Sequence, residues 1–328
     1  MTINISDIAS MANVSKSTVS RYLNGGSVSQ KTKDKIDKIV QETGYSPNQF
    51  AQSLKAKRTF MIGAIIPRLD SYAANQILEG ADTYLREIKY QTLIVNTSQS
   101  IEQEIEALYT LNKNKVDGIL LIATQITKQH IEAIQEIKAP VILVGQSDEH
   151  VPSVIQNDFE AGRTIGELFG QQNFKRIAYL GVDEYDKAVG VERKKGILSG
   201  LKRYNQTPDV YYTTFDLQQA VVAAKPLVSQ YDALICGTDN IALGTLKAAH
   251  HQHIQVPNQL SIAGFGGYDT TSIVTPSLAT ISFPYKQTGE KAAQNLIRII
   301  NGEAIKQIEV MDFEFIKNNS IDLSESNE

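Results

Sequence analysis

Short hydroxyl and basic side chains follow one another near the amino terminus. Ser15, Lys16, Ser17 and Thr18 are followed by Arg21. Hydroxyl groups and the cations of Lys and Arg donate hydrogen bonds to phosphate oxygens, and an arginine also fits the O6 and N7 acceptors of guanine. Contact with nucleic acid is therefore the chemistry that these residues favour. The alternative is the solvated polar face of a small helical hairpin.

Two short helices must position these side chains. Within residues 5–24 the apolar residues recur three or four apart, which predicts two helices that each bury one face. Asp7 and Ser15 stand where N-caps are expected, and Ser29 is the expected N-cap of a third helix that ends at Gly44. The polar residues then lie on the outward face of the second helix. This pattern is typical of a helix-turn-helix motif, whose second helix enters the major groove of DNA.

The charge of the chain is unevenly distributed. Residues 1–60 contain nine Lys and Arg and four Asp and Glu residues, a formal charge of +5. Because the whole chain of 328 residues carries −4, the remainder carries −9. A small basic region on an acidic body is typical of a nucleic-acid-binding protein whose larger part has another task.

From residue 60 onward, apolar runs typical of strands alternate with amphipathic stretches typical of helices. This alternation predicts parallel sheets covered on both faces, and its two successive series predict two doubly wound α/β lobes behind an all-α headpiece. The predicted strands are at residues 60–67, 92–97, 117–123, 140–145, 176–181, 210–215, 232–237 and 260–266. The predicted helices include residues 75–89, 101–113, 129–137 and 161–171.

Several other functions are disfavoured. No apolar run is long enough to span a membrane and no signal peptide follows Met1, so we expect a cytoplasmic protein rather than an exported sugar-binding transport protein. The single cysteine, Cys236, lies in an apolar run and is more typical of a core residue than of a nucleophile. His250, His251 and His253 do not converge with other ligands, so we expect no metal and no cofactor. No nucleotide-binding loop indicates an enzyme.

Polar residues that follow predicted strands are candidates for a small-molecule site, because ligands of doubly wound folds bind at the carboxyl ends of strands. An arginine at such a strand end suits a phosphate group, although Arg68 could instead form a salt bridge with Asp70. Asp239 could accept hydrogen bonds from the hydroxyl groups of a ligand or cap the helix that follows it. The candidates of this kind are Arg68, Ser71, Gln146, Thr238 and Asp239.

The segments DIASMANVSKSTVSRYLN, VSQKTKDKIDKIVQETGYSPN, VDGILLIA, NDFEAGRTIGELF and GTDNIALGTLKAA closely resemble the lactose-repressor/galactose-repressor (LacI/GalR) family of bacterial transcription factors. The resemblance implies a headpiece (1–46), a hinge helix and linker (47–59) and a two-lobed core like that of periplasmic sugar-binding proteins (60–328). The expected N-lobe comprises about 60–158 and 286–310, and the C-lobe about 159–285 and 311–328. The chain is expected to cross between lobes near residues 159, 285 and 310.

The resemblance also implies how DNA is bound. Residues 16–23 become the recognition helix of a homodimer that binds a palindromic, double-stranded operator, with Lys16, Ser17 and Arg21 facing bases. Leu54, on a hinge helix at residues 48–55 too short to be stable alone, would insert into the minor groove. Asn13 replaces the glycine of many relatives in the turn, which asparagine tolerates. The residues expected at phosphates are Ser15, Thr18, Asn24, Ser29, Thr32, Tyr45 and Asn48.

For the effector, the resemblance places Arg193 in the sugar pocket. The alternative is that Arg193 is an exposed residue on the surface of a helix. Gly266 and Gly267 stand where many relatives have a sugar-binding aspartate, so the backbone and Tyr268 contribute there instead. The RLDS segment at Arg68 is similar to the trehalose-repressor branch, and GFGGYD is similar to sucrose-operon repressors. We therefore expect a repressor of a sugar-utilisation operon, with sucrose favoured, released by a sugar or sugar phosphate. The alternatives are a trehalose-operon repressor that responds to trehalose 6-phosphate, a corepressor-dependent regulator and an activator.

Overall fold

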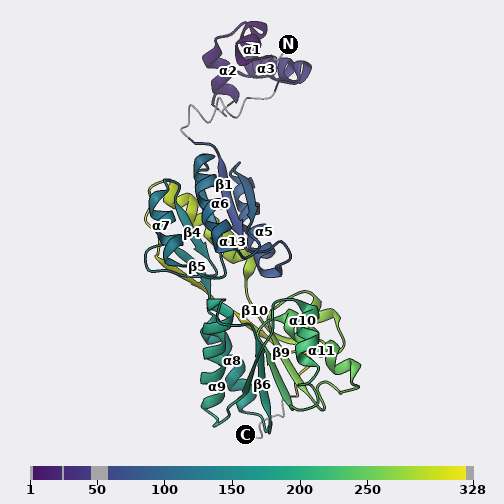
Figure 1. Ribbon diagram of the computed structural model, residues 1–328. Coiled ribbons are helices and arrows are strands. Elements are labelled where there is room, and N and C mark those ends of the chain that lie inside the picture. The colour runs from purple at the N-terminus through teal and green to yellow at the C-terminus, as the bar shows by residue number, and fades with distance from the viewer. Residues whose placement is uncertain (1–2, 24–25, 46–57, 323–328) are drawn as a thin grey trace. The chain divides into compact units, whose positions relative to one another are not determined.

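The computed structural model describes residues 3–23, 26–45 and 58–322 (Figure 1). The chain divides into two compact units, residues 1–60 and 61–328. The predicted hinge helix, with Asn48 and Leu54, lies outside the described residues, as does Asn24.

The first unit is a three-helix headpiece of α1 (Ile5–Ala12), α2 (Lys16–Leu23) and α3 (Gln30–Thr43). Its small core is made by the buried side chains of Ile8, Ala9, Ala12, Val19 and Ile36. These residues recur three or four apart in α1, so a single face of that helix is buried. The helix-turn-helix prediction is confirmed for the described residues.

One predicted cap in the headpiece is wrong. Helix α1 begins at Ile5, and its N-cap is Asn4 rather than Asp7. The Asn4 side chain accepts from the amides of Ser6 and Asp7, while the Asp7 carboxylate accepts from the Asn4 amide at 2.8 Å. Asp7 is thus the third residue of a reciprocal capping box. Ser29 and Gly44 cap α3 as predicted.

The second unit contains two six-stranded sheets with helices on both faces, as predicted. The first sheet has the strand order β11-β5-β4-β3-β1-β2, and all its neighbours are parallel. Its strands are β1 (Met61–Ile66), β2 (Gln91–Asn96), β3 (Gly118–Ile122), β4 (Val141–Val144), β5 (Ser153–Gln156) and β11 (Ile308–Met311). Its helices are α5 (Tyr72–Glu87), α6 (Ile101–Lys113), α7 (Lys128–Glu136) and α13 (Tyr285–Ile300).

The second sheet repeats this order as β12-β10-β9-β8-β6-β7, with β12 antiparallel to β10. Its strands are β6 (Ile177–Gly181), β7 (Asp209–Tyr212), β8 (Ala233–Cys236), β9 (Ser261–Gly266), β10 (Ala279–Ser282) and β12 (Glu314–Ile316). Helices α8 (Asp158–Gly170) and α9 (Lys194–Lys202) lie on one side of it, and α10 (Leu217–Ala224) and α11 (Asp239–His251) on the other (Figure 1). A π-helix, η1 (Lys187–Arg193), leads into α9, and a short helix, α12 (Thr270–Ile273), follows β9.

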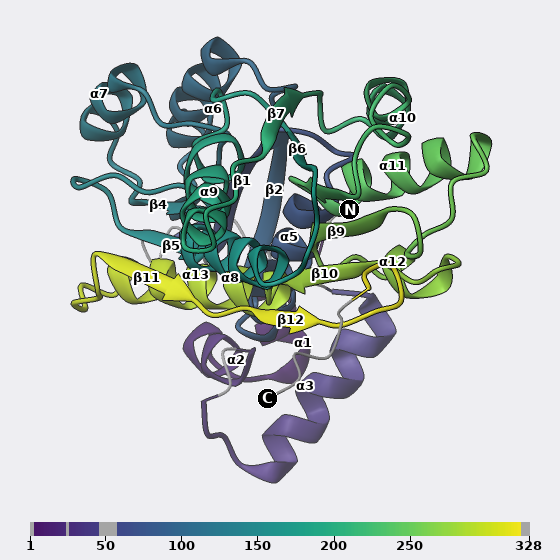
Figure 2. The same ribbon diagram turned by 90° about the horizontal axis from the view of Figure 1, so that it is seen from below.

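The chain passes between the sheets three times. It leaves the first sheet after β5, returns after β10 and leaves again between β11 and β12. Figure 2 shows β11 and β12 in succession, each at the edge of its own sheet. After the second passage α13 packs closely on α5, where a Cβ on Gly80 would lie 1.9 Å from the Lys286 carbonyl oxygen. Only glycine permits this approach of the two backbones.

Candidate effector cleft and DNA-contacting face

The polar residues of the recognition helix form an exposed face. Lys16, Ser17 and Arg21 are exposed on α2, whereas Val19 on the opposite face is fully buried. Ser15 precedes the helix, and its Oγ accepts a hydrogen bond from the Thr18 amide at 3.2 Å, so it is the predicted N-cap. The helix therefore presents two cations and a hydroxyl group without using them in the headpiece core.

The residues expected at phosphates cluster at helix starts. The Ser15 hydroxyl lies 2.8 Å from the hydroxyls of both Ser17 and Thr18, and the Ser29 hydroxyl lies 2.8 Å from that of Thr32. Helix amino termini carry unpaired amides and a partial positive charge, which attract anions. Tyr45 is partly buried against the headpiece core.

In the second unit, the two sheets place equivalent strand ends at one cleft. The strand order of each sheet reverses between its first and third strands, β1 and β3 in one and β6 and β8 in the other. Ligands of such folds bind at this point. A cleft of about 890 Å³ lies there, lined from both lobes, and its lining includes the candidates Arg68, Ser71, Gln146, Arg193 and Thr238.

Arg68 is half-buried at the end of β1. Its guanidinium lies 5.1 Å from the ring centroid of Phe215, which belongs to the other lobe, and 3.6 Å from the Asp70 carboxylate. The Asp70 side chain is 78% exposed, so this ion pair is well solvated and weak. Both predicted roles of Arg68 are therefore compatible with its position. The hydroxyl of Ser71 accepts from the Ala74 amide and caps α5.

Arg193 is buried in the cleft rather than exposed on a helix. Its Nε and Nη2 donate to Asp158 Oδ1 at 3.0 and 2.5 Å, and its Nη1 donates to the Gly237 carbonyl at 2.6 Å. The rings of Phe265 and Phe283 lie 4.9 and 5.1 Å from the guanidinium carbon. Burial alone would lower the pKa of Arg193, but the Asp158 carboxylate raises it above the ordinary arginine value. The guanidinium stays charged, and two of its five N–H groups form no hydrogen bond to the described residues.

Asp239 has neither of its two predicted roles. Thr238 caps α11, while Asp239 is fully buried and does not line the cleft. Its carboxylate accepts from the Thr280 hydroxyl at 2.6 Å and from the Tyr268 amide at 2.9 Å. Burial raises the pKa of Asp239 to about 6. The residue therefore fixes the Tyr268 backbone, and its neighbour Thr238 lines the cleft.

Gly266 also lies outside the main cleft. It lines a separate cavity of about 440 Å³ together with Gly267 and Tyr72. Tyr268 does line the main cleft, and its ring stacks on that of Tyr72 with centroids 4.1 Å apart. Because these two tyrosines belong to different lobes, the stack is a contact across the cleft.

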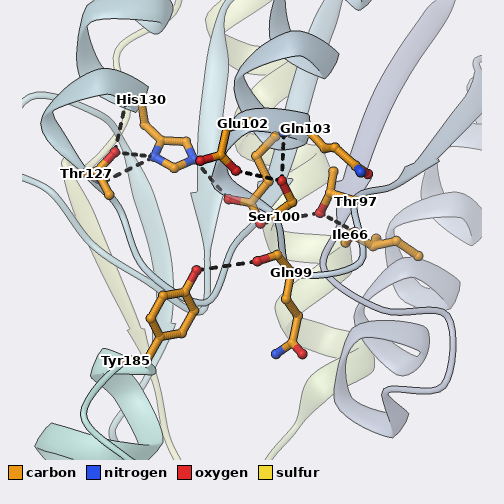
Figure 3. Close-up of polar contacts among 10 residues, drawn as sticks. Ile66, Thr97, Gln99, Ser100, Glu102, Gln103, Thr127, His130 and Tyr185 are labelled. Carbon is orange, nitrogen blue, oxygen red and sulfur yellow. Dashed lines mark hydrogen bonds and ion pairs between the residues drawn. The ribbon is translucent and has the colours of Figure 1, made fainter.

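A loop after β2 forms one wall of the cleft and is anchored to buried polar groups (Figure 3). The Thr97 hydroxyl donates to the Ile66 carbonyl at 3.2 Å, and the buried carboxylate of Glu104 lies 2.9 Å from His130 Nε2. The Gln99 carbonyl accepts from the Tyr185 hydroxyl of the other lobe at 3.4 Å. The buried pair of Glu104 and His130 thus lies behind the loop, which contacts the other lobe through Gln99.

Several cleft residues were missed from the sequence. Gln156 is the last residue of β5 and Asp158 follows soon after it, and this strand of four residues was not predicted. Asp186 lies at the N-cap of η1, and its carboxylate accepts from the Val189 amide at 2.9 Å. Burial raises the pKa of Asp186 to about 6. The sequence signal that could have revealed Asp158 is the polar pair at 157–158 after an apolar segment.

The comparisons with known proteins agree with this architecture. The family model of bacterial regulatory proteins of the lacI family matches residues 4–48, and that of a periplasmic binding protein-like domain matches residues 166–317. The sucrose operon repressor of Staphylococcus xylosus is 45% identical over 95% of this chain and 98% of its own. The chain belongs to the LacI family. The resemblance on which the sequence prediction relied is confirmed.

Two further comparisons are at lower sequence identity. Catabolite control protein A of Staphylococcus aureus is 30% identical over 95% of this chain and 96% of its own. The solved lac repressor dimer bound to operator and the anti-inducer ONPF matches with a TM-score of 0.88 at 21% identity, covering 98% of this chain and 99% of that one. This match shows the shared fold. Within the described part of our chain, no helix is both long and apolar enough to span a membrane.

Proposed function

We propose that this LacI-family protein represses a sucrose-utilisation operon and is released from its operator by a sugar or sugar phosphate bound in the cleft between its lobes. The observation that carries the proposal is the 45% identity to a sucrose operon repressor, which extends over 95% of the chain and so includes headpiece and core. The protein would act as a homodimer in the cytoplasm, without a cofactor, metal or catalytic activity.

The headpiece supplies the DNA-binding part of this proposal. The exposed side chains of Lys16, Ser17 and Arg21 would contact base edges, and a guanidinium that reads guanine adds about 1–3 kcal/mol of discrimination. The hydroxyl groups at the starts of α2 and α3 would contact phosphates together with Tyr45. We also propose DNA contacts for Asn24, Asn48 and Leu54. The proposed domain boundaries are 1–46, 47–59 and 60–328.

The cleft supplies the regulatory part. Arg68 at the end of β1 would bind the phosphate of a sugar phosphate, while Arg193 and Thr238 would meet sugar hydroxyls. Binding would favour one orientation of the lobes, because the cleft is lined from both. A coupling of about 1–3 kcal/mol changes operator affinity by roughly 5- to 150-fold.

The test begins with selection of the operator from randomised duplexes by the purified dimer. Sucrose, sucrose 6-phosphate, trehalose and trehalose 6-phosphate are then titrated into the complex with labelled operator, and release is followed by fluorescence anisotropy. We expect release by sucrose 6-phosphate. In Arg68→Ala this release is lost, whereas any response to unphosphorylated sucrose is kept.

Each other outcome points to a different regulator. Release only by the trehalose compounds would indicate a trehalose-operon repressor, and tighter operator binding with any sugar would indicate a corepressor. Release by neutral sucrose alone, unchanged by Arg68→Ala, would rule out the phosphate contact. Absence of any selected palindrome would overturn the repressor proposal itself.

A further inference from the structure

One buried polar atom of the cleft has no partner among the described residues. Gln156 is the last residue of β5 and lines both the main cleft and an adjoining cavity of about 550 Å³. The residue is only 7% exposed, yet its Oε1 receives no hydrogen bond. A buried acceptor without a donor costs about 1–3 kcal/mol, so such an atom indicates a partner that binds there.

The hydrogen bonds around Gln156 fix which end of its amide faces the cleft. The Thr288 hydroxyl donates its single hydrogen to the Pro284 carbonyl at 3.0 Å, and therefore can only accept from Gln156, at 2.8 Å. Gln156 must present its Nε2 donor to Thr288. The opposite assignment of the amide would place two acceptors against each other. The free atom is thus the acceptor Oε1, and its missing partner is a hydrogen-bond donor.

An acceptor at this position selects among chemical groups. A hydroxyl group can donate to Oε1, whereas a phosphate dianion or a carboxylate has no hydrogen to give and would be repelled. The opposite preference holds at the Arg68 end of the cleft, where the guanidinium has only donors. In the first sheet β5 and β1 are separated by β4 and β3. These three strand spacings amount to about 14 Å, a separation wider than a single sugar ring.

We propose that Gln156 is a specificity-determining residue whose Oε1 accepts a hydrogen bond from a sugar hydroxyl at the opposite end of the cleft from the group that Arg68 binds. This inference rests on the proposed function and names the ligand class as an oligosaccharide of at least two rings, with its anionic group at β1 and an uncharged, hydroxyl-bearing ring at β5. Gln156 also lies next to two of the passages of the chain between the lobes. One is reached through Thr288, whose hydroxyl donates to the Pro284 carbonyl, and the other through the Asn157 amide, which donates to the Met311 carbonyl at 3.2 Å.

The test measures binding of sucrose 6-phosphate and of its monodeoxyfluoro analogues to the full-length protein by calorimetry. Gln156→Met keeps the length of the side chain but removes its acceptor, and we expect sucrose 6-phosphate to bind about 10- to 100-fold more weakly. Fluorine cannot donate a hydrogen bond. The analogue with fluorine in place of the hydroxyl that meets Oε1 should therefore bind the wild type more weakly by a similar factor. Gln156→Met should bind this analogue as tightly as it binds sucrose 6-phosphate. Fructose 6-phosphate and glucose 6-phosphate, which have one ring, should bind both proteins equally.

Controls separate a binding effect from a folding effect. Gln156→Met must unfold at no lower temperature than the wild type. Thr288→Val, which removes the acceptor that supports the amide together with the hydrogen bond to the Pro284 carbonyl, should weaken binding less than Gln156→Met. Unchanged affinity in Gln156→Met would overturn the inference, because it would mean that only water meets Oε1. An equal loss for the one-ring phosphates would overturn the two-ended arrangement. Failure of wild-type protein to bind either sucrose or sucrose 6-phosphate would instead overturn the proposed function.

Discussion

At the scale of single residues, the cleft depends on one buried ion pair. The side chains of Arg193 and Asp158 are 4% and 7% exposed, and the carboxylate holds the guanidinium beside the rings of Phe265 and Phe283. Removing one partner of such a pair leaves the other charge buried and poorly compensated, which is more destabilising than loss of a solvated pair.

Asp158→Asn should therefore lower the free energy of unfolding by about 3 kcal/mol, measured by urea denaturation with circular dichroism. The matched control is Glu160→Gln on the same helix, because Glu160 forms a partly exposed pair with Arg163. That control should be indistinguishable from the wild type. Equal losses in the two variants would contradict a special role for the buried pair.

Asp186 should make the affinity of the cleft for anions depend on pH. Its pKa in the free protein is raised to about 6 by burial, and a bound anion would raise the pKa further. The complex then binds more protons than the free protein, so affinity is greatest below pH 6 and falls as the pH rises above it. A sucrose sulfate ester, whose own charge is constant, should show this fall between pH 5.5 and 8 in calorimetric titrations. Asp186→Asn should remove it, and a persistent slope in that variant would assign the titration to another group.

At the scale of secondary-structure elements, the headpiece shows how the ends of helices are held. Asn13 has φ = 51° at the end of α1, and the left-handed conformation that the turn requires is one that asparagine adopts at small cost. Beyond α2, the Gly26 amide donates to the Arg21 carbonyl at 2.8 Å. A Cβ on Gly26 would lie 2.5 Å from Arg21 Cγ and 2.9 Å from the Arg21 carbonyl oxygen. The backbone and side chain of Arg21 are therefore sensitive to this glycine.

Gly26→Ala should displace Arg21 and weaken binding to the selected operator by about tenfold, the lower end of the loss expected for one arginine–guanine contact. Binding to random DNA at low salt should change little, because phosphate contacts dominate it. Anisotropy titrations with both duplexes measure the two effects. The control is Ser27→Ala, a substitution at the exposed residue next to Gly26. Equal weakening on both duplexes would mean that the headpiece as a whole was disturbed.

The elements that the sequence predicted are those with strong local patterns. The eight apolar runs correspond to β1 to β4 and β6 to β9. Six of these strands are buried, which requires continuous apolar residues, whereas β2 and β7 are partly exposed at the edges of their sheets. The strands β5, β10, β11 and β12 were missed, since each has only three or four residues and polar ones interrupt them, as in SVIQ and IEVM. Their pairing is determined by neighbouring strands rather than by their own sequence.

The same difference between strong and weak strand patterns explains which cleft residues were predicted from the sequence and which were missed. Arg68 and Thr238 were predicted because they follow recognisable strands, and Gln156 and Asp158 were missed because β5 was not recognised. The error at Asp239 has another cause. Its partners Thr280 and Tyr268 are distant in sequence, so only the folded structure shows that they occupy its carboxylate.

At the scale of the second unit, the two lobes are joined by a few direct contacts across the cleft. Tyr72 stacks on Tyr268, and the Lys187 amide donates to the Thr124 carbonyl at 3.4 Å. An aromatic pair contributes about 0.5–1.5 kcal/mol beyond the area that it buries. The cleft is therefore held by interactions small enough for a ligand to shift the balance between lobe orientations.

Tyr72→Ala should loosen the lobes without unfolding either of them. We expect the Lys187 amide to exchange with deuterium several-fold faster than in the wild type, since its acceptor lies in the other lobe. Amides within the sheets, such as those of Leu121 and Ile235, should exchange at unchanged rates. Mass spectrometry of peptic fragments measures both groups in one sample. Faster exchange throughout a lobe would indicate that the variant destabilises the lobe itself.

The strand β1 has one further consequence. It begins at Met61, directly after the last residue of the first unit, and Arg68 lies two residues beyond its other end. Five of its six residues are buried and it is paired on both sides, by β2 and β3. The end of the core where Arg68 lies is thus joined to the boundary of the first unit by a strand of about 20 Å that has no room to bend. Any displacement of the Ile66 end of β1 would therefore move its Met61 end as well.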